Sequence, residues 1–394
     1  MIRRPPRSTL SSSSAASDVY KRQLKHFMRI GIDARMINNT GIGRYLRNLL
    51  RQLARLDRQN KYLLFLNKGE SFALAQENFT TIPLNISVPL YSLREQYWLP
   101  LEIRRWQPDL IHYPNFNVPI ISRSSYLVTI HDLIYFLYPE QCPSRLAHCY
   151  ARRMLAHSSK HANLVLTDSE CSKQDLQRYF RLPAEKIRVI LPAADERAFP
   201  GEPNPEILAR YEMTQPYILY VGKHHAYKNI MTLMQAYMAQ RDIYQNFQLV
   251  IAGKRDSRQK TLYDAAAQFD CGKRILFTDF VPDADLFDLY RGARLFVFPS
   301  RYEGFGLPPL EAMACGVPVI CSNAASLPEV VGDAAISVKP DDASALVDAI
   351  CSVLTDENLW QTLKNKGLAR AQQFSWETAA RQLLEVYEDA AEMA

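Results

Sequence analysis

Two features that define large classes of proteins are missing from this sequence. No stretch of 18 consecutive apolar residues occurs, so we expect no helix that spans a membrane. The seven cysteines form no C-x-x-C pair, and their odd number does not suit a disulfide framework. We therefore expect a protein of the reducing cytoplasm that holds no structural zinc.

Excess charge is also missing from most of the chain. The full sequence has 47 basic and 41 acidic residues, a net charge of +6. Residues 1–27 contain six of the basic residues and one acidic residue, so the remainder has 41 basic and 40 acidic residues, a net charge of +1. A nearly neutral body gives no support for binding nucleic acid.

The first 27 residues differ in composition from the rest of the chain. They are rich in Ser and Arg, are almost free of acid and lack the apolar region of a secretory signal, so a transit peptide is one interpretation. The segment also resembles translated sequencing-adaptor read-through, and Met28 offers a second start. Either way, the polar composition predicts disorder.

Short apolar runs alternate with longer amphipathic stretches after Met28, which is the pattern of an α/β fold. Most runs are β-branched or aromatic and end at Gly, Asp, Ser or Pro, as strands do. Six strands are expected on each side of Pro192–Pro216. They are Met28–Ile32, Tyr62–Leu66, Leu110–Tyr113, Tyr126–Ile130, Leu164–Thr167, Ile187–Leu191, Tyr217–Val221, Gln248–Ala252, Ile275–Thr278, Leu295–Phe298, Pro318–Cys321 and Ala335–Val338.

The segment Pro192–Pro216 has little periodicity and several prolines, so we interpret it as a linker between two domains. Each half then forms a Rossmann-like α/β domain. Ligands of open α/β sheets bind beyond the carboxyl ends of the strands. Two facing domains therefore predict one ligand-binding cleft between them.

The most informative stretch of the sequence lies around two glutamates, Glu303 and Glu311, eight residues apart. The apolar run Leu295–Phe298 precedes them, and Gly304 and Gly306 lie between them, followed by a Pro-Pro pair that suits the first turn of a helix. A strand, a glycine turn and a helix N-terminus form a phosphate site. We expect Glu303 just before the turn and Glu311 in the first turn of the helix, where two acceptors flanking a phosphate suit a nucleotide sugar.

This stretch resembles the E-x7-E motif of the retaining glycosyltransferases of family 4, which have the GT-B fold of two facing Rossmann-like domains. The resemblance covers nearly all of residues 28–394. It implies that Glu303 binds hydroxyls of the donor sugar and that Glu311 binds the ribose. The alternative is that both are acids placed favourably near the positive end of a helix.

The same resemblance implies a division of the chain. Residues 1–27 are the disordered or artefactual extension, and 28–200 form an N-terminal acceptor-side Rossmann-like domain. Residues 201–373 form the C-terminal donor-binding Rossmann-like domain. Residues 374–394 form a C-terminal helix that crosses back to the N-terminal domain.

Two further segments of the first half match the family. Gly41 and Gly43 open a helix, but Leu46 stands where a dinucleotide fingerprint has its third glycine, so a dehydrogenase is not favoured. A simple tight turn stays the alternative. His131 matches the family's catalytic-site histidine, and we expect Asp132 to orient its ring or cap the next helix, with the first role favoured. A purely structural histidine is the other interpretation.

In the second half, Lys223 and Lys228 match the cations that hold the diphosphate, although the family usually has Arg at the first position. Val281 matches the segment beside the base. Catalytic roles are thus expected for His131 and Glu303, ribose binding for Glu311 and base binding for Val281. The residues expected to bind the donor diphosphate are Gly41, Gly43, Lys223, Lys228, Gly304, Phe305, Gly306 and Leu307.

Asp283 and Asp285 look like a metal-binding D-x-D motif, but they precede a helical pattern and are interpreted as its N-cap and first-turn acids. The resemblance implies no divalent ion and no cofactor, because the nucleotide sugar is itself the substrate.

The sequence therefore predicts a retaining hexosyltransferase that acts on a glycan or lipid-linked acceptor. Gly31–Tyr45 and Glu95-Gln96 look closest to mannosyltransferases of surface-polysaccharide assembly, which favours GDP-mannose as donor. A nucleotide-sugar 2-epimerase of the same fold and a binding-only protein stay open. The basic and aromatic stretches Tyr91–Trp106 and Ser144–His161 are either solvated helix faces or a rim that meets anionic lipid at the inner face of the membrane.

Overall fold

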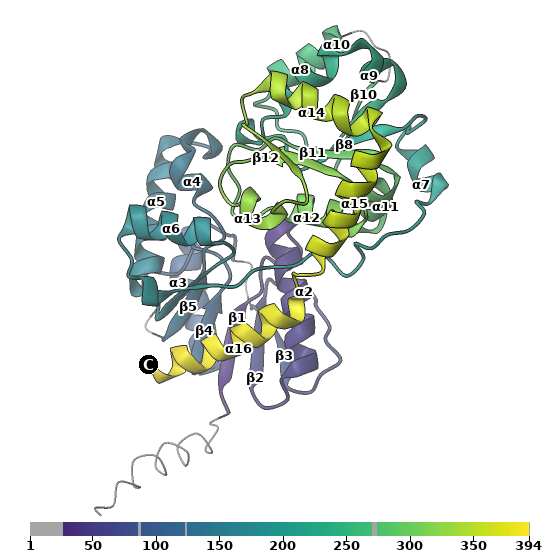
Figure 1. Ribbon diagram of the computed structural model, residues 1–394. Coiled ribbons are helices and arrows are strands. Elements are labelled where there is room, and N and C mark those ends of the chain that lie inside the picture. Colours follow the sequence, from purple (N-terminus) through teal and green to yellow (C-terminus); the bar gives the residue numbers. More distant parts are fainter. Residues whose placement is uncertain (1–26, 86–87, 123, 270–273, 394) are drawn as a thin grey trace, which may run out of the picture.

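The computed structural model describes residues 27–85, 88–122, 124–269 and 274–393, so the disorder predicted for the N-terminal extension lies outside the described residues except at Phe27. Two α/β domains, each a parallel sheet covered by helices, follow one another along the chain (Figure 1). The predicted fold class of two Rossmann-like domains is confirmed.

Within the described residues, the first sheet has seven parallel strands in the order β3-β2-β1-β4-β5-β6-β7. They are β1 (Arg29–Asp33), β2 (Lys61–Leu66), β3 (Phe79–Pro83), β4 (Leu110–Tyr113), β5 (Tyr126–Thr129), β6 (Leu164–Thr167) and β7 (Ile187–Val189). Sequence reasoning missed β3. This edge strand buries only Ile82 and ends in proline, so it lacks the apolar run that marks an inner parallel strand.

Three helices of the first domain begin at a serine that caps the helix N-terminus. The hydroxyls of Ser92, Ser144 and Ser169 each accept a hydrogen bond from a first-turn backbone N–H. The helices are α2 (Gly41–Leu56), α3 (Leu93–Arg105), α4 (Ile134–Leu137), α5 (Arg145–His161) and α6 (Glu170–Phe180), with short 3₁₀ helices η1 (Pro139–Gln141) and η2 (Ala184–Lys186).

The described part of the second sheet has six parallel strands in the order β10-β9-β8-β11-β12-β13. They are β8 (Tyr217–Val221), β9 (Gln248–Ala252), β10 (Ile275–Asp279), β11 (Leu295–Phe298), β12 (Val319–Ser322) and β13 (Ile336–Val338). The helices of this half are α7 (Pro205–Arg210), α8 (Ile230–Ala239), α9 (Arg241–Asn246), α10 (Lys260–Gln268), α11 (Asp283–Gly292), α12 (Leu307–Ala314), α13 (Leu327–Val331), α14 (Ala343–Thr355) and α15 (Glu357–Ala371), with η3 (Ala226–Lys228). The segment interpreted as an irregular linker thus contains a short helix, α7.

The last helix, α16 (Trp376–Glu392), lies against the first domain, although it follows the second in sequence (Figure 1). Trp376, Leu383 and Tyr387 are buried in one apolar cluster with residues of β1, β2 and α2. The hydroxyl of Tyr387 lies 2.9 Å from Nδ1 of His112 in β4. The core of the first domain therefore includes this distant helix.

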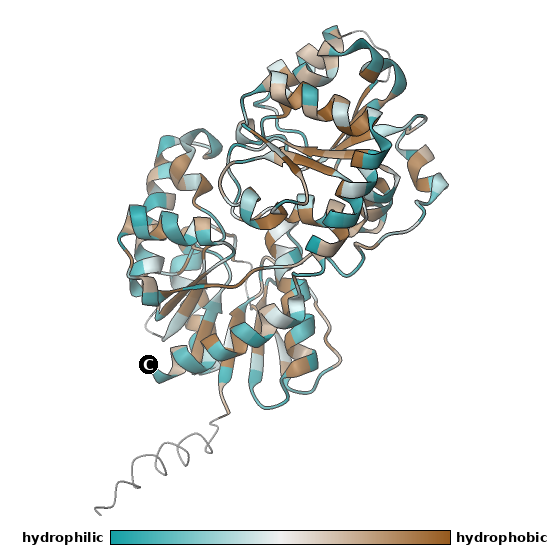
Figure 2. Cartoon of the chain, viewed as in Figure 1, coloured by the Kyte–Doolittle hydropathy of each residue, from teal (hydrophilic) through white to brown (hydrophobic). Residues whose placement is uncertain are grey.

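Apolar residues concentrate in the two sheets, whereas the outer helix faces are polar (Figure 2). Strands buried on both faces read as continuous apolar runs, which explains why their sequence pattern was clear. Within the described residues, no helix combines the length and apolar character that crossing a bilayer requires.

The domains also touch at the N-terminus of α6. The carboxylate of Glu329, in α13, accepts hydrogen bonds from the backbone N of Glu170 at 2.8 Å and of Cys171 at 2.6 Å. A carboxylate is favoured at this positive helix end. The hydroxyl of Tyr302 donates to Asp175 in the same helix at 2.7 Å.

Candidate active site

In each sheet the strand order reverses between two central strands, and ligands of open α/β sheets bind at such points. The reversal lies between β1 and β4 in the first sheet and between β8 and β11 in the second. The segment after β8 carries Lys223 and Lys228, and the loop after β11 carries Glu303. These predicted donor residues therefore lie at the reversal point of the second sheet.

Lys228 and Glu303 form an ion pair between these two segments. Nζ of Lys228 donates to the two carboxylate oxygens of Glu303 at 2.6 and 2.8 Å. The ammonium also lies 5.1 Å from the ring centre of Tyr227 and 5.2 Å from that of Phe298, contacts that favour a cation. The pair places a fixed positive charge and an oxygen acceptor side by side at the glycine turn.

The glycine turn itself contacts the first domain. A Cβ at Gly304 would lie 2.2 Å from the carbonyl oxygen of His131, so this approach requires glycine. The carbonyl oxygen of Gly304 accepts a hydrogen bond from Oγ of Ser169 at 2.7 Å. The structure thus brings His131 and the glycine turn together from different domains.

The imidazole of His131 is held between two acceptors. Its Nδ1 lies 2.7 Å from Oδ2 of Asp168, and its Nε2 lies 3.1 Å from the carbonyl oxygen of Pro114. The doubly protonated ring satisfies both contacts, because each partner accepts. Burial disfavours the charged ring, but the Asp168 carboxylate outweighs it and raises the pKa of His131.

The favoured expectation that Asp132 orients His131 is wrong. Oδ1 of Asp132 accepts a hydrogen bond from the backbone N of Ile134 at 2.8 Å, at the start of α4, which is the capping role also considered. Asp168 follows the neighbouring strand β6 and supplies the orienting carboxylate. The available clue was that adjacent parallel strands end at the same edge, which places Asp168 beside His131.

The N-terminus of α12 is built as the sequence indicates. Gly306 precedes it with a φ of 128°, a backbone angle that strains other residues. The Pro-Pro pair lies inside the first turn and has no N–H groups, so Gly306 and Leu307 provide the backbone donors available to an anion there. Phe305 is buried and anchors the turn.

Glu311 lies beyond its predicted position. The first turn of α12 holds no acidic residue, because the helix begins at Leu307 and Glu311 is in its second turn. Its side chain is only 1% exposed. Burial raises the pKa of Glu311, and the nearby Arg44 opposes that rise. Glu311 is therefore a buried carboxylate held by a cation, in place of the first-turn acid we expected.

Arg44 is a residue that sequence reasoning did not single out. It lies in the first turn of α2 and donates from Nη1 to Oε1 of Glu311 at 2.6 Å and from Nη2 to Oδ1 of Asp283 at 2.7 Å. Burial disfavours its charge, but Glu311 and Asp283 raise the pKa of Arg44. The position directly after Gly43 was the available clue. Its partner Glu311 is 267 residues away, which no local pattern reveals.

The two glycines at the start of α2 have different surroundings. A Cβ at Gly43 would lie 2.5 Å from the carbonyl oxygen of Ile37, so the protein itself requires glycine there. A Cβ at Gly41 would meet nothing within 4 Å. Gly41 therefore has open space in front of it, into which a ligand can come close.

Lys223 and Val281 are less closely tied to the other predicted residues. Lys223 is exposed and, among the described residues, forms no ion pair. Loss of hydration where the ammonium lies near the protein, followed by repulsion from Lys228 and Lys254, lowers the pKa of Lys223. Val281 is buried after β10, whereas the neighbouring Phe280 is 57% exposed.

Asp283 and Asp285, the two acids of the D-x-D motif, form ion pairs with arginines. Asp283 accepts hydrogen bonds from three arginines, and Asp285 accepts from Arg210 at 2.9 Å and from the hydroxyl of Tyr211 at 2.8 Å. Both stand in the first turn of α11 as predicted, although the N-cap is Pro282. Their environment is that of structural ion pairs.

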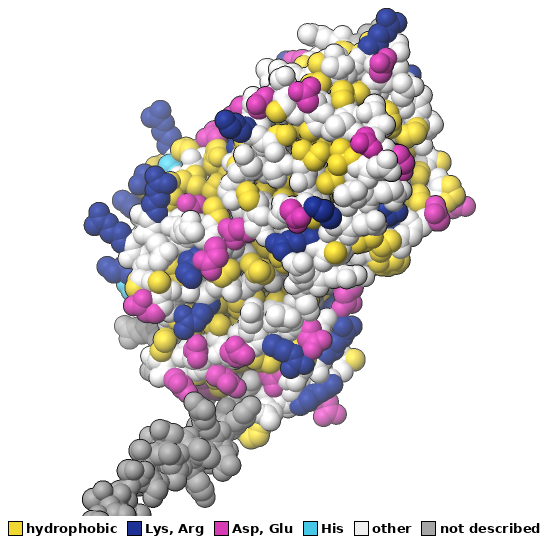
Figure 3. Space-filling view, in the orientation of Figure 1, with side chains coloured by type: hydrophobic (Ala, Val, Ile, Leu, Met, Phe, Trp, Pro, Cys, Tyr) yellow, Lys and Arg dark blue, Asp and Glu magenta, His cyan; other side chains and the backbone are white. Residues whose placement is uncertain are grey.

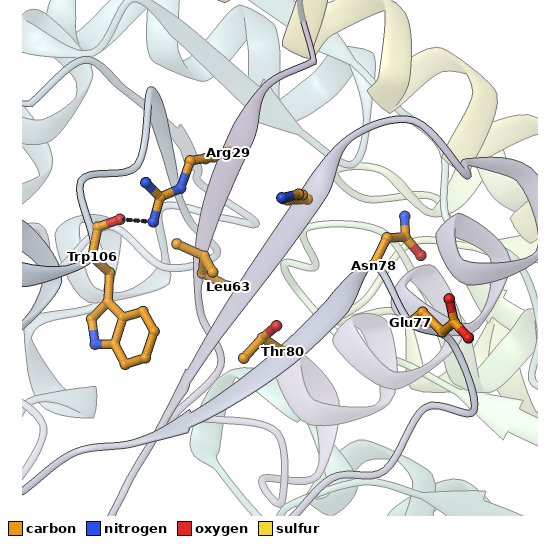
Figure 4. Close-up of a pocket in the computed structure, with 7 residues that line it drawn as sticks. Arg29, Leu63, Glu77, Asn78, Thr80 and Trp106 are labelled. Atoms are coloured by element: carbon orange, nitrogen blue, oxygen red, sulfur yellow. Dashed lines mark hydrogen bonds between the residues drawn. The ribbon is translucent and has the colours of Figure 1, made fainter.

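Two surface hollows bear on the location of the site. One of about 480 Å³, lined by Arg29, Leu63 and Trp106 among others, lies at the amino ends of the first-sheet strands (Figure 4). No predicted site residue lines it. The other, of about 400 Å³, lies between the domains and is lined by Arg47, Arg197 and Asp283 among others. The second hollow therefore borders the ion pairs around Arg44.

Two family models match the chain, each over one half. The model described as Glycosyltransferase Family 4 matches residues 39–197. The model described as Glycosyl transferases group 1 matches residues 206–370. The predicted strands and site segments of both halves fall almost entirely within these two ranges.

Individual proteins are similar over most of the chain. It is 35% identical over 369 residues to the O-antigen chain mannosyltransferase B of Escherichia coli, covering 88% of this chain and 96% of the relative. The structure of sucrose-phosphate synthase from Thermosynechococcus elongatus has a TM-score of 0.75 at 23% identity and covers 92% of this chain and 98% of its own. The structure of Anabaena HepE in complex with UDP-glucose has a TM-score of 0.70 at 18% identity. The match covers 92% of this chain and 99% of the HepE chain. Because both identities are below 25%, these two structures support the fold assignment and nothing beyond it.

Proposed function

This chain belongs to the family 4 glycosyltransferases, and we propose that it transfers mannose from GDP-mannose to a glycan or lipid-linked saccharide with retention of the anomeric configuration. The preference for mannose is supported by 35% identity to an O-antigen mannosyltransferase over 88% of the chain. The segments Gly31–Tyr45 and Glu95-Gln96, which look closest to mannosyltransferases, support the same donor.

One observation carries the assignment of the site. Lys228, Glu303 and Gly304 converge at the reversal point of the second sheet, and His131 meets them from the first domain. A cation, an acceptor carboxylate and a helix N-terminus in one place match the parts of a nucleotide sugar. Sugar-binding and phosphate-binding groups are therefore adjacent, as a glycosyl donor requires.

The ion pair suggests how the donor enters. In the structure, Lys228 and Glu303 satisfy each other. The donor offers its β-phosphate to Lys228 and its hexose hydroxyls to Glu303, so each side chain exchanges its partner for one part of the substrate. The N–H groups of Gly306 and Leu307 add hydrogen bonds to the same diphosphate. As the bond to the sugar breaks, fixed positive charge stabilises the charge that builds on the departing phosphate.

Retention is what membership of this family implies, and no described carboxylate near the turn stands out as a covalent nucleophile, so we propose attack from the front face. Asp132 caps α4, and Glu303 is assigned to the hydroxyls of the donor sugar. We place the attacking hydroxyl on the face from which the nucleoside diphosphate departs. The bond between the anomeric carbon and the phosphate oxygen breaks, the acceptor oxygen bonds to that carbon, and the phosphate oxygen takes the acceptor's proton. We place His131 beside this step, because its backbone carbonyl lies at the glycine turn.

We also place the enzyme in the cytoplasm, in peripheral contact with the anionic inner face of a membrane. The helix α3 supports this with an exposed apolar face. Leu93, Tyr97, Trp98 and Leu101 are 81, 59, 46 and 50% exposed. Their spacing puts them on neighbouring turns of one helix. Apolar and aromatic residues of this kind enter the headgroup region of a bilayer.

Basic residues lie next to this face. Nε2 of Gln96 in α3 lies 3.2 Å from the hydroxyl of Tyr150 in α5, so the two helices are neighbours. The exposed basic residues of α5 are Arg145, Arg152, Arg153 and Lys160. Figure 3 shows Lys and Arg side chains along the edge of the molecule where α5 and α6 lie. Positive charge beside an apolar face suits anionic lipid.

The proposal is tested by measuring thermal unfolding with a panel of nucleotide sugars and then assaying transfer to saccharide acceptors. Because a bound donor stabilises the folded state, GDP-mannose should raise the melting temperature more than GDP-glucose or UDP-glucose. The product should keep the donor's anomeric configuration by NMR. Stabilisation by UDP-glucose alone would overturn the donor assignment. Epimerisation of the donor, or binding without any transfer, would overturn the proposed reaction.

A further inference from the structure

We infer that Arg44 is a positioning residue that compensates the buried carboxylate of Glu311 from the opposite domain, and so completes the ribose-binding end of the nucleotide site only when the domains are together. The inference rests on the proposed function, which assigns ribose to Glu311. It adds a residue that the E-x7-E motif does not contain.

The geometry of the pair supports this role. Nη1 of Arg44 lies 2.6 Å from Oε1 of Glu311, and the two side chains are 14% and 1% exposed. Arg44 belongs to α2 of the first domain and Glu311 to α12 of the second. Separation of the domains therefore removes the cation from the carboxylate. A buried carboxylate without a partner is strongly disfavoured.

The other groups around Glu311 do not replace Arg44. Asp283 at the start of α11 and Asp195 after β7 carry the same charge as Glu311 and favour its neutral form. Tyr290 of α11 donates a hydrogen bond to Oε2 at 3.3 Å, and Cys315 borders the end of α12. Burial raises the pKa of Glu311, and Arg44 is the contacting cation that opposes it.

A second observation separates positioning from blocking. Nε of Arg44 is buried and has no hydrogen-bond partner among the described residues. A carboxylate oxygen can accept from two donors, so Glu311 can keep Arg44 and still accept a ribose hydroxyl. The unpartnered Nε–H also shows that protein acceptors do not saturate the guanidinium. Arg44 is thereby placed to stay in the site when nucleotide binds.

This arrangement links nucleotide binding to domain closure. When α2 lies against α12, Arg44 favours the charged form of Glu311, which accepts hydrogen bonds strongly. When the domains separate, Glu311 loses the cation that holds its carboxylate in place. The donor is then held firmly only in the state that also brings His131 to the glycine turn.

The test is calorimetric titration of the full chain with GDP between pH 6 and 9, using Arg44→Met and Arg44→Lys. Without Arg44 the neutral form of Glu311 is favoured, so Arg44→Met should bind GDP several-fold more weakly at pH 6 than at pH 9. Arg44→Lys should restore most of the affinity and a weaker pH dependence than that of Arg44→Met, because it keeps a positive charge at this position.

Arg47→Met is the matched control. Arg47 lies one turn further along α2 and contacts Asp283 at 3.1 Å, but not Glu311. Its removal should leave the pH profile of GDP affinity unchanged. Thermal unfolding of every variant separates a lost contact from a lost fold. Tighter GDP binding by Arg44→Met would identify Arg44 as a blocking latch, and unchanged affinity at all pH values would also overturn the inference.

A double variant separates this inference from the proposed function. In a Glu311→Gln background no charge needs compensation, so adding Arg44→Met should change GDP affinity by less than about twofold. If Glu311→Gln alone leaves GDP affinity unchanged, the ribose assignment itself fails. If Glu311→Gln weakens binding but Arg44→Met acts additively with it, the ribose assignment stands and the role of Arg44 falls.

Discussion

The proposed roles of Lys228 and Glu303, which form an ion pair, can be tested by substituting each residue. Lys228→Ala removes the cation that faces the departing phosphate. We expect the transition state to lose about 3–4 kcal/mol of stabilisation, as for other fixed electrostatic groups, and turnover to fall accordingly. Steady-state kinetics with GDP-mannose, the proposed donor, measures this. Lys223→Arg is the control and should keep its activity, because it restores the residue usual in the family. Wild-type turnover in Lys228→Ala would remove Lys228 from the site.

Substitutions of the two glutamates of the motif should affect different quantities, turnover for Glu303 and nucleotide affinity for Glu311. Glu303→Gln should mainly lower kcat, because Glu303 acts where the sugar gains positive charge. Glu311→Gln should mainly weaken binding, including that of GDP alone, by about 1.5–3 kcal/mol for a lost charged hydrogen-bond acceptor. Comparing GDP affinity and kcat for both variants checks this. Small, similar losses of stability with intact chemistry would favour the interpretation as helix-end acids.

The pair of His131 and Asp168 predicts a pH dependence of stability. Asp168 raises the pKa of His131 in the folded protein. The contribution of this pair to the free energy of unfolding is therefore complete below the pKa of His131 in the unfolded chain, about 6.5, and is lost as the pH rises through its pKa in the folded protein. The stability lost in Asp168→Asn should therefore be largest in acid and shrink toward pH 9. Urea unfolding at a series of pH values measures it.

Asp132→Asn is the control for that series. Asp132 caps α4 and does not hydrogen-bond to the ring, so its replacement should change the pH profile much less. A loss of stability in Asp168→Asn that is the same at every pH would contradict the charged state of His131.

At the level of elements, regular structure was predictable and long-range contacts were not. Each of the twelve apolar runs coincides with a strand to within about two residues, because strands buried on both faces need continuous apolar sequence. The edge strand β3 lacks that requirement and was missed. The partners Arg44 and Asp168 were missed for a different reason. Their roles depend on which loops meet at the strand ends, which local sequence does not encode.

The glycine loops allow a test that separates structural from ligand-facing glycines. Gly304→Ala puts a methyl group 2.2 Å from the carbonyl oxygen of His131, so the domains should no longer approach and activity should be largely lost. Gly41→Ala meets no protein atom within 4 Å and should leave the melting temperature unchanged. If Gly41 faces the diphosphate, that variant should still weaken GDP binding. Unaltered GDP binding by Gly41→Ala would contradict its predicted role.

For the whole molecule, the apolar face of α3 predicts association with membranes. The full chain should sediment with vesicles containing anionic lipid and much less with neutral vesicles. Leu93→Ser with Leu101→Ser should reduce this binding several-fold, because each lost apolar side chain removes buried area in the headgroup region. Leu191→Ser, at a position 41% exposed outside α3, is the control. Equal binding by all three proteins would contradict a role for this face.

The return of α16 to the first domain also constrains how the chain is made. A ribosome delivers β1 and α2 long before Trp376, yet these segments share one apolar cluster. Because domains fold as units during synthesis, the second domain can finish folding while the first still waits for its closing helix. The first half of the nascent chain therefore carries exposed apolar surface throughout most of translation. Chaperone dependence and aggregation during expression should accordingly originate in the half that is synthesised first.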